Sequence, residues 1–387
     1  MLNKFFIRFM AVLAVTFSVA LVSCDKTPDP EDLGTSLTPA NSHIISSSGT
    51  YNFQTVKGNS SDPVGAVASA EVLWETFGTA ETPAKGAIIA ETEYIAKDGV
   101  IRFKTPSSLK DGNALIAAKD AAGNILWSWH IWVCKDWDPE KTAQTYYNNA
   151  GIMMDRNLGA TTATPGAVTS LGLLYQWGRK DPFLGASSIT EKVLASSTLQ
   201  WPEAVASTAE TGTIAYAISH PTTFIYSKEA NYDWYYTGKF ETDNTRWQTE
   251  KTIYDPCPAG WVLPTGPTPE DAGFWYTTYR RYNMSYDMDV EHRGMNFTKV
   301  FSDADPVWYP LAGFRADDDG QLWAVGNNSG FWTSTPDLDE DDPQAKVMAF
   351  GLDLNAFSAT EVATFTATDY CRAVGFSVRC VAEKAAK

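Results

Sequence analysis

Two aromatic segments contain the residues whose types best suit ligand binding. They span residues 231–236 and 274–287, and both mix tyrosine and tryptophan with Asp, Asn or Arg. A flat ring covers the C–H face of a sugar or part of a protein epitope, while polar neighbours bond hydroxyl or backbone groups. The same composition also suits rings that fill a core. The candidate ligand-binding residues are Tyr232, Trp234, Tyr235, Tyr236, Arg280 and Tyr282.

Two acidic runs, at residues 317–319 and 337–342, have the residue types that calcium prefers. Calcium takes several oxygen ligands, which carboxylates at alternate loop positions supply. Neither run has the spacing of an EF-hand, and acidic turns between strands are commonly only solvated. The metal candidates are Asp317, Asp319, Asp339 and Asp341. The sequence predicts no other cofactor.

Catalytic motifs are missing from the sequence. The four histidines, at positions 43, 130, 220 and 292, form no HExxH or HxH pattern, and no CxxC occurs. There is also no GxSxG elbow, phosphate-binding loop or dinucleotide fingerprint. His130 alternates with tryptophans in an extended pattern, which is typical of a packed or surface histidine in a strand. We therefore expect a binding protein rather than an enzyme.

The N-terminal residues resemble the signal peptide and lipobox of a bacterial lipoprotein. Lys4 and Arg8 begin the segment, and an apolar run from residue 9 to 22 closely precedes Cys24. This run has the length of a signal-peptide core and is short for a membrane span. The resemblance implies that residues 1–23 are removed and that Cys24 carries the lipid in the outer membrane, exposed at the cell surface. An ordinary secretory signal is the alternative.

The chain is strongly acidic. It has 30 basic and 46 acidic residues and a formal net charge of −16 at pH 7. Such a surface repels phosphate backbones and anionic lipid headgroups, which argues against a nucleic acid partner. We therefore expect contact with the membrane only through the N-terminal lipid.

The first folded part must follow a linker. Residues 24–40 are rich in proline and acid, which predicts an extended acidic tether. Residues 41–140 contain short runs of period two that are separated by turns. The clearest run is 125–133, and it follows a hairpin-type turn at 120–124. The pattern favours an all-β sandwich over residues 41–140.

Residues 146–383 have a different pattern, with dense aromatics and long loops. A helical pattern occurs at 269–279, and short strands are predicted at 331–334, 345–350 and 376–381. Long loops usually argue against a compact domain. The C-type-lectin-like fold, an α+β domain with long loops around a small sheet, accommodates them.

Six motifs occur in order within this second part. They are MDRNLGA (154–160), LYQWGR (174–179), YDPCPAGWVLPT (254–265), LAGFR (311–315), GFWTST (330–335) and GFSVRCV (375–381). In this order they resemble the Fibrobacter-type major paralogous (FISUMP) domain of bacterial surface lipoproteins, which implies a C-type-lectin-like fold. The N-terminal sequence GNALIAAKDAAGNILWSWHIWV is similar to fimbrillin-like lipoproteins of Bacteroides-type bacteria.

The resemblance also implies a disulfide between Cys257 and Cys380. Cys257 stands between two prolines at an early strand, Cys380 lies in the last predicted strand, and these two strands are neighbours in a lectin-like fold. Four cysteines after Cys24 allow three connectivities if all of them pair. A local bridge between Cys371 and Cys380, a second pair of Cys134 with Cys371, and two free thiols all remain open.

These expectations describe a lipid-anchored cell-surface binding or adhesion protein. It would be associated with fimbriae and would recognise a glycan or a protein through its lectin-like domain. Two alternatives use the same architecture. One is a structural pilus subunit that assembles by strand addition. The other is a glycan-capture lipoprotein of an uptake system.

Overall fold

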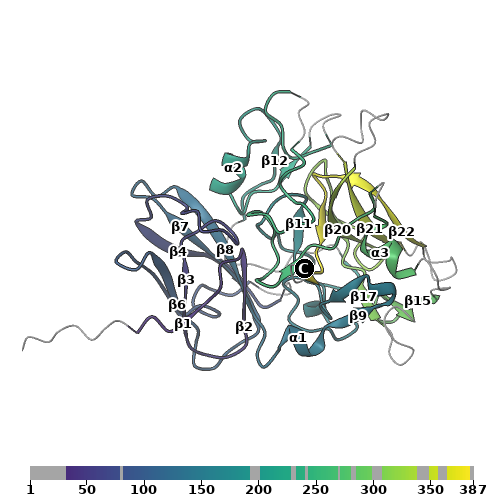
Figure 1. Ribbon diagram of the computed structural model, residues 1–387, viewed down its shortest axis with the longest axis horizontal. Coiled ribbons are helices and arrows are strands. Elements are labelled where there is room, and N and C mark those ends of the chain that lie inside the picture. The colour runs from purple at the N-terminus through teal and green to yellow at the C-terminus, as the bar shows by residue number, and fades with distance from the viewer. Residues whose placement is uncertain are drawn as a thin grey trace, which may run out of the picture. The chain divides into compact units, whose positions relative to one another are not determined.

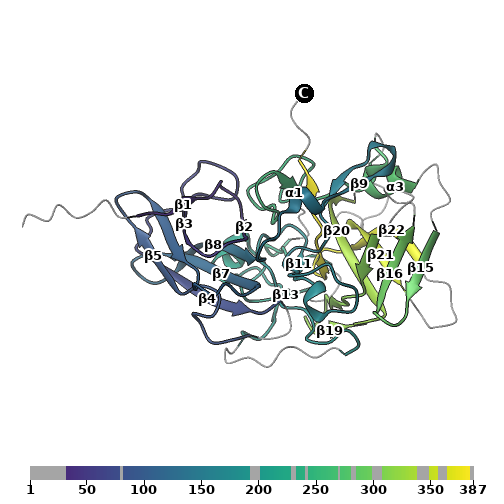
Figure 2. The same cartoon turned by 90° about the horizontal axis from the view of Figure 1, so that it is seen from below.

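The structure is a computed structural model (Figures 1 and 2). It describes residues 32–78, 82–191, 201–227, 232–239, 243–268, 271–279, 285–298, 307–337, 348–355 and 364–383. The described residues from Leu33 onward belong to one compact unit. They are mostly β-strands with few helices, as the sequence predicts.

Two four-stranded sheets form in the N-terminal part. The first has the order β1 (Thr35–Ser36), β3 (Thr50–Gln54), β6 (Val100–Lys104), β5 (Glu91–Ile95). The second has the order β2 (Ser42–Ile45), β8 (Ile125–Val133), β7 (Gly112–Lys119), β4 (Ser69–Thr76). Apolar residues of both sheets meet in one cluster that includes Phe53, Phe103 and Trp129. Strand β1 lies within the segment that we predicted to be a tether.

The hairpin between β7 and β8 forms where the sequence predicts it. The Asp120 carboxylate accepts hydrogen bonds from the backbone N–H groups of Ala122 (2.9 Å) and Asn124 (2.8 Å). Gly123 has a φ of 87°, a left-handed conformation that glycine adopts without strain. After this turn, Trp127 and the alternate residues of β8 enter the cluster between the two sheets, as their period-two pattern predicts.

The other face of β8 packs against the second part of the chain. The Trp132 indole N–H donates to the carbonyl of Ala160 (3.0 Å). Ser128 donates through its hydroxyl to Asp181 (2.6 Å), and its carbonyl accepts from the Lys180 ammonium (3.0 Å). Strand β8 is therefore buried on both faces, and its sheet is the middle of three layers.

A buried polar group lies in this middle layer. Ser42 Oγ lies 3.1 Å from His130 Nδ1, and Asn113 Oδ1 lies 2.8 Å from His130 Nε2. Burial lowers the pKa of His130 and of its neighbour His43 to about 3. Both imidazoles are therefore neutral in the folded protein. His130 is therefore a packed histidine within a strand, which is one of the two environments that the sequence predicted for it.

The second part contains several smaller sheets. The largest has the order β19 (Leu322–Trp323), β18 (Phe314–Arg315), β23 (Gly375–Ser377), β20 (Asn328–Pro336), β21 (Met348–Asn355), β22 (Thr364–Cys371), with β11 (Leu174–Gln176) pairing with β23. Another has the order β14 (Trp261–Val262), β24 (Val381–Ala382), β10 (Gly151–Met153), β9 (Gln144–Tyr146). The others are β15 (Ser285–Asp289), β16 (Gly294–Thr298), β17 (Val307–Pro310), and the pair β12 (Val205–Ala206), β13 (Ile225–Tyr226).

Helices are short throughout the described residues. They are α1 (Pro139–Thr142), α2 (Ile214–Ser219), α3 (Gly273–Tyr279), and the 3-10 turns η1 (Tyr147–Asn149) and η2 (Val168–Ser170). Helix α3 falls within the predicted helix at 269–279. Helix α2 was not predicted, although Thr213 caps it by accepting from the backbone N–H of Tyr216 (3.1 Å).

The predicted strand at 376–381 was wrong as a single element. The chain leaves the large sheet after β23 and pairs again only at β24, which belongs to a different sheet. Cys380 therefore lies just before the last strand rather than in it. The break allows one short segment to join two sheets, which an alternation of apolar and polar residues does not reveal.

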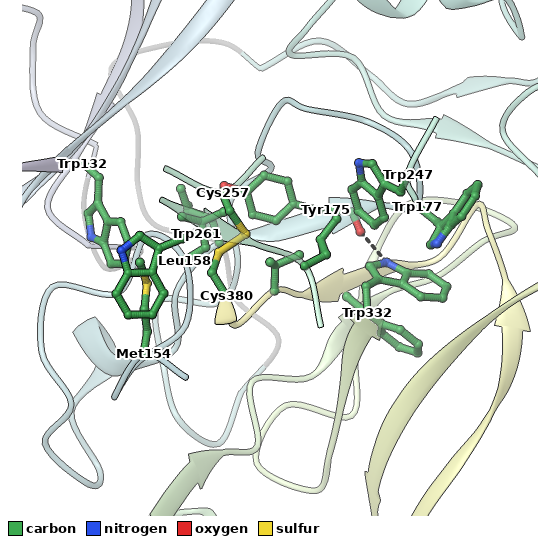
Figure 3. Close-up of a cluster of buried hydrophobic side chains, with 14 of the residues drawn as sticks. Trp132, Met154, Leu158, Tyr175, Trp177, Trp247, Cys257, Trp261, Trp332 and Cys380 are labelled. Atoms are coloured by element: carbon green, nitrogen blue, oxygen red, sulfur yellow. Dashed lines mark hydrogen bonds between the residues drawn. A yellow bond between two sulfur atoms is a disulfide. The ribbon is translucent and has the colours of Figure 1, made fainter. Parts of the chain in front are cut away.

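A disulfide joins Cys257 and Cys380, as the resemblance implied, with their Cα atoms 6.0 Å apart. It lies in a large apolar cluster that combines Trp132 from β8 with residues of the second part (Figure 3). In the same cluster the Trp332 indole N–H donates to the Tyr175 carbonyl (2.8 Å). The two parts of the chain thus share one buried core.

Candidate functional site

A cavity of about 650 Å³ opens on the large C-terminal sheet, beside β20, β21 and β22, which lie side by side in Figures 1 and 2. Residues from β18, β20, β21, β22 and β23 and from three adjoining turns form its wall. They are Phe314, Asp317, Ala324, Asn327, Asn328, Asp353, Tyr370, Cys371, Val374 and Phe376. The cavity therefore draws on segments that are far apart in sequence, and strand pairing brings them together.

A carboxylate is fixed in the wall of the cavity. Asp353 on β21 lies opposite Gly330 on β20, so its side chain projects from the same face as that of Asn328, two residues earlier. The Asn328 amide donates to the Asp353 carboxylate (2.8 Å), and the Tyr370 hydroxyl also bonds to it. Burial raises the pKa of Asp353, while these two hydrogen bonds act in the opposite direction.

Three aromatic rings form the apolar side of the cavity. The Phe376 ring is buried and packs edge-on against Tyr370 and Phe314, with centroids 4.9 Å and 6.0 Å away. A Cβ atom at Gly330 would come within 2.4 Å of the Phe376 ring, so this position requires glycine. Tyr370 and Phe314 are half-buried and present ring surface to the cavity.

The charge of the cavity wall is negative. Asp317 and Asp353 contribute carboxylates, and the described wall residues include no lysine or arginine. Two arginines directly follow wall residues in the sequence. Arg315 donates to the carbonyls of Leu184 (3.0 Å) and Gly320 (2.7 Å), and Arg372 donates to the Asn244 side chain (2.7 Å). Rings, carboxylates and amides together suit a ligand that has apolar faces and hydroxyl donors.

Cys134 and Cys371 are free thiols, which is one of the alternatives that the sequence left open, and the second pair between them does not form. Cys134 is buried at the end of β8 and contacts the Ala160 carbonyl (3.6 Å), and burial raises its pKa to about 12. Cys371 lines the cavity instead, where burial and the Asp317 carboxylate raise its thiol pKa. Each sulfur therefore has a separate environment, at β8 and at β22.

Trp234, at the centre of the predicted aromatic site, is buried, as in the alternative in which these rings fill a core. Trp234 is only 1 % exposed, and its indole N–H donates to the Trp177 carbonyl (2.7 Å). The guanidinium of Arg246 lies 4.6 Å from the Trp234 ring and pairs with Asp233. This tryptophan is part of a core in which the polar groups bond to one another.

The other predicted ligand residues that the structure describes do not line the cavity. Tyr232, Tyr235 and Tyr236 are half-buried near Trp234 and lie outside the cavity wall. Arg280 and Tyr282 lie outside the described residues. Among the described residues, the structure thus brings none of the predicted aromatic residues to the cavity.

The predicted calcium ligands separate in the structure. Asp317 lines the cavity, whereas the Asp319 carboxylate accepts from the backbone N–H of Gln321 (2.8 Å) and closes a turn. Asp339 and Asp341 lie outside the described residues. Within the described ranges, no group of three or more His, Cys, Asp or Glu side chains is arranged to hold a metal ion.

Sequence reasoning missed Asp353, Asn328 and Tyr370. One signal was present in β21, where Gly351 and Asp353 alternate with leucines. Such alternation predicts a strand with one small, polar face. That face forms part of the cavity, but only strand pairing shows which aromatic residues stand beside it.

Cys24, which the sequence predicts to carry a lipid, lies outside the described residues. In the part of the chain that the structure does describe, no helix has both the length and the apolar character that a membrane span requires.

Comparisons of the chain with protein-family models, with curated proteins and with solved structures found no match.

Proposed function

We propose that this protein is a lipid-anchored cell-surface binding protein that recognises a glycan in the cavity on its C-terminal sheet. The observation that carries the proposal is the pairing of ring surface at Phe314 and Tyr370 with a fixed carboxylate at Asp353. A sugar needs both features, since rings cover its C–H faces and carboxylates accept from its hydroxyls. A hollow of about 650 Å³ fits a few sugar units better than a broad protein epitope.

The finer architecture that we propose is an N-terminal β-sandwich followed by a C-type-lectin-like domain of the FISUMP type. The shared apolar cluster between the two N-terminal sheets supports the sandwich. The six ordered motifs and the Cys257–Cys380 bridge support the lectin-like domain. The lipobox-like segment supports lipidation of Cys24 and an outer-membrane location. The similarity of residues 112–133 to fimbrillin-like lipoproteins supports a fimbria-associated role in adhesion.

A second candidate function is that of a structural pilus subunit, and strand β1 favours it. Thr35 and Ser36 are both exposed and pair parallel with β3 at the edge of their sheet. Displacement of so short a strand would open the edge of β3 to a strand from another subunit. Filaments of the purified chain in electron micrographs would support this function. A glycan-capture lipoprotein would use the same cavity as our first proposal.

The test of glycan recognition is a glycan array probed with the full chain, in calcium and in a chelator. Asp353→Asn keeps the shape of the side chain but removes its charge, and we expect binding to fall about 10- to 100-fold. Asp318→Asn is the matched control, because Asp318 is exposed and lies outside the wall. An array without any bound glycan, or unchanged binding by Asp353→Asn, would contradict the proposal.

A further inference from the structure

A large exposed ring stands next to the cavity. Trp323 is 46 % exposed, although most tryptophans in the described residues are buried or half-buried. It lies directly opposite Phe314 in the pairing of β18 with β19. Directly opposed residues of an antiparallel pair project from the same face of the sheet. Trp323 therefore projects beside a ring that lines the cavity.

The backbone around Trp323 is tightly fixed. Gly313 has a φ of 71°, and the Trp323 carbonyl oxygen lies close to it. A Cβ atom at position 313 would be only 2.4 Å from this oxygen, so the position requires glycine. Ala324 then turns the chain with a φ of 52°, and its carbonyl accepts from the N–H groups of Asn327 and Asn328 (2.9 Å each). The same turn thus holds Trp323 and positions two amides of the cavity wall.

The charge of the wall restricts the sugars that fit. Asp317 and Asp353 would repel a uronic or sialic acid, and no described wall residue is a lysine or arginine that would offset them. Uncharged sugars meet no such penalty, and their hydroxyls donate to both carboxylates.

We propose that Trp323 forms a second subsite, which stacks the next unit of an uncharged oligosaccharide whose first unit occupies the cavity. This inference rests on the proposed glycan recognition. Stacking on an indole ring adds apolar contact without a need for specific hydrogen bonds. Affinity should therefore rise with chain length beyond one sugar unit, and the rise should depend on residue 323.

The experiment measures the affinity of the full chain for four series of oligosaccharides, each a ladder of one to four units. The units are glucose, mannose, galactose or N-acetylglucosamine. Oligogalacturonate is the acidic comparison. For the wild type, we expect a gain of about fivefold to tenfold from one unit to two in the ladder that binds. Trp323→Ala should lose this gain and keep the affinity for the single unit. Trp323→Phe should restore part of the gain. Ile152→Ala, which alters an exposed apolar side chain on β10, should behave like the wild type.

The outcomes separate this inference from the proposed function. Binding that does not increase with length, or an increase that survives in Trp323→Ala, would overturn the subsite and leave glycan recognition in place. Tighter binding of oligogalacturonate would overturn the restriction to uncharged sugars. Failure of every ladder, together with an empty glycan array, would overturn both proposals.

Discussion

Two regions of the molecule place charged side chains against aromatic rings, and only one of them is open to solvent. Around Trp234, the guanidiniums of Arg246 and Arg372 lie over the Trp177 ring at 5.2 Å and 4.4 Å, and Asp233 pairs with Arg246. The cavity near Asp353 also combines rings with a carboxylate, but Phe314 and Tyr370 stay half-exposed. Residue types alone do not distinguish the two regions.

The difference lies in the partners of the polar groups. In the buried region, the Asp233 carboxylate pairs with the guanidiniums of Arg246 and Arg372, and the Trp234 indole bonds to a carbonyl. Such a network holds the chain together and leaves little capacity for a ligand. In the cavity, the carboxylates of Asp317 and Asp353 have no arginine or lysine beside them in the described wall. Carboxylates that lack a cationic partner can accept hydrogen bonds from a ligand.

The strongest test of this comparison is Trp234→Ala. Because Trp234 is buried, its removal should lower the free energy of unfolding by about 3–5 kcal/mol. Denaturant unfolding measures this loss, and Ile152→Ala, at an exposed position on β10, is the control, with a cost of under about 1 kcal/mol. A Trp234→Ala protein that is as stable as the wild type but no longer binds its ligand would contradict this comparison. It would indicate that the binding site lies at residues 232–236.

A second test uses acid to weaken the buried framework. His43 and His130 have pKa values of about 3 in the fold against 6.5 when unfolded, so the unfolded chain binds protons first. Stability is therefore complete above pH 6.5 and falls as the pH drops toward 3, by about 2–3 kcal/mol for each histidine at pH 4.5. Unfolding midpoints measured from pH 8 to pH 4 check this.

His43→Leu provides the control for the acid effect. His43 stacks on Phe53 at 4.9 Å, and its Nε2 atom has no hydrogen-bond partner among the described residues. An apolar side chain should therefore cost little at pH 8 and should remove about half of the acid sensitivity. The same acid sensitivity in His43→Leu and in the wild type would contradict this assignment.

The smallest expected effect is on the pH dependence of glycan binding. Both carboxylate oxygens of Asp353 can accept hydrogen bonds from sugar hydroxyls only when Asp353 is ionised. Burial raises the pKa of this carboxyl group. Affinity should therefore decline on acidification at a higher pH than for an ordinary aspartate, by about tenfold overall. Titrations in the His43→Leu background separate this decline from unfolding, and Asp353→Asn should make the profile flat. A wild-type profile that is already flat would remove Asp353 from the site.

Much of the fold followed from local pattern. The β7–β8 hairpin, the two faces of β8 and helix α3 were predictable because each depends on neighbouring residues in the sequence. The cavity was not predictable, since it also depends on the pairing of β23 with β18 and with β20, and other strands separate these partners in the sequence. The burial of Trp234 was missed for the same reason, as its bond to Trp177 spans 57 positions.

The free Cys371 gives the disulfide a competitor during folding. Cys371 comes nine positions before Cys380, so a chain that has not yet folded can also link Cys371 to Cys257. Such a link would tie β22 to the wrong strand and would need reshuffling. In the folded protein, burial and the Asp317 carboxylate raise the pKa of the Cys371 thiol, so little thiolate is present to exchange with the native disulfide. The folded cavity wall thus protects the bridge from the sulfur that could displace it.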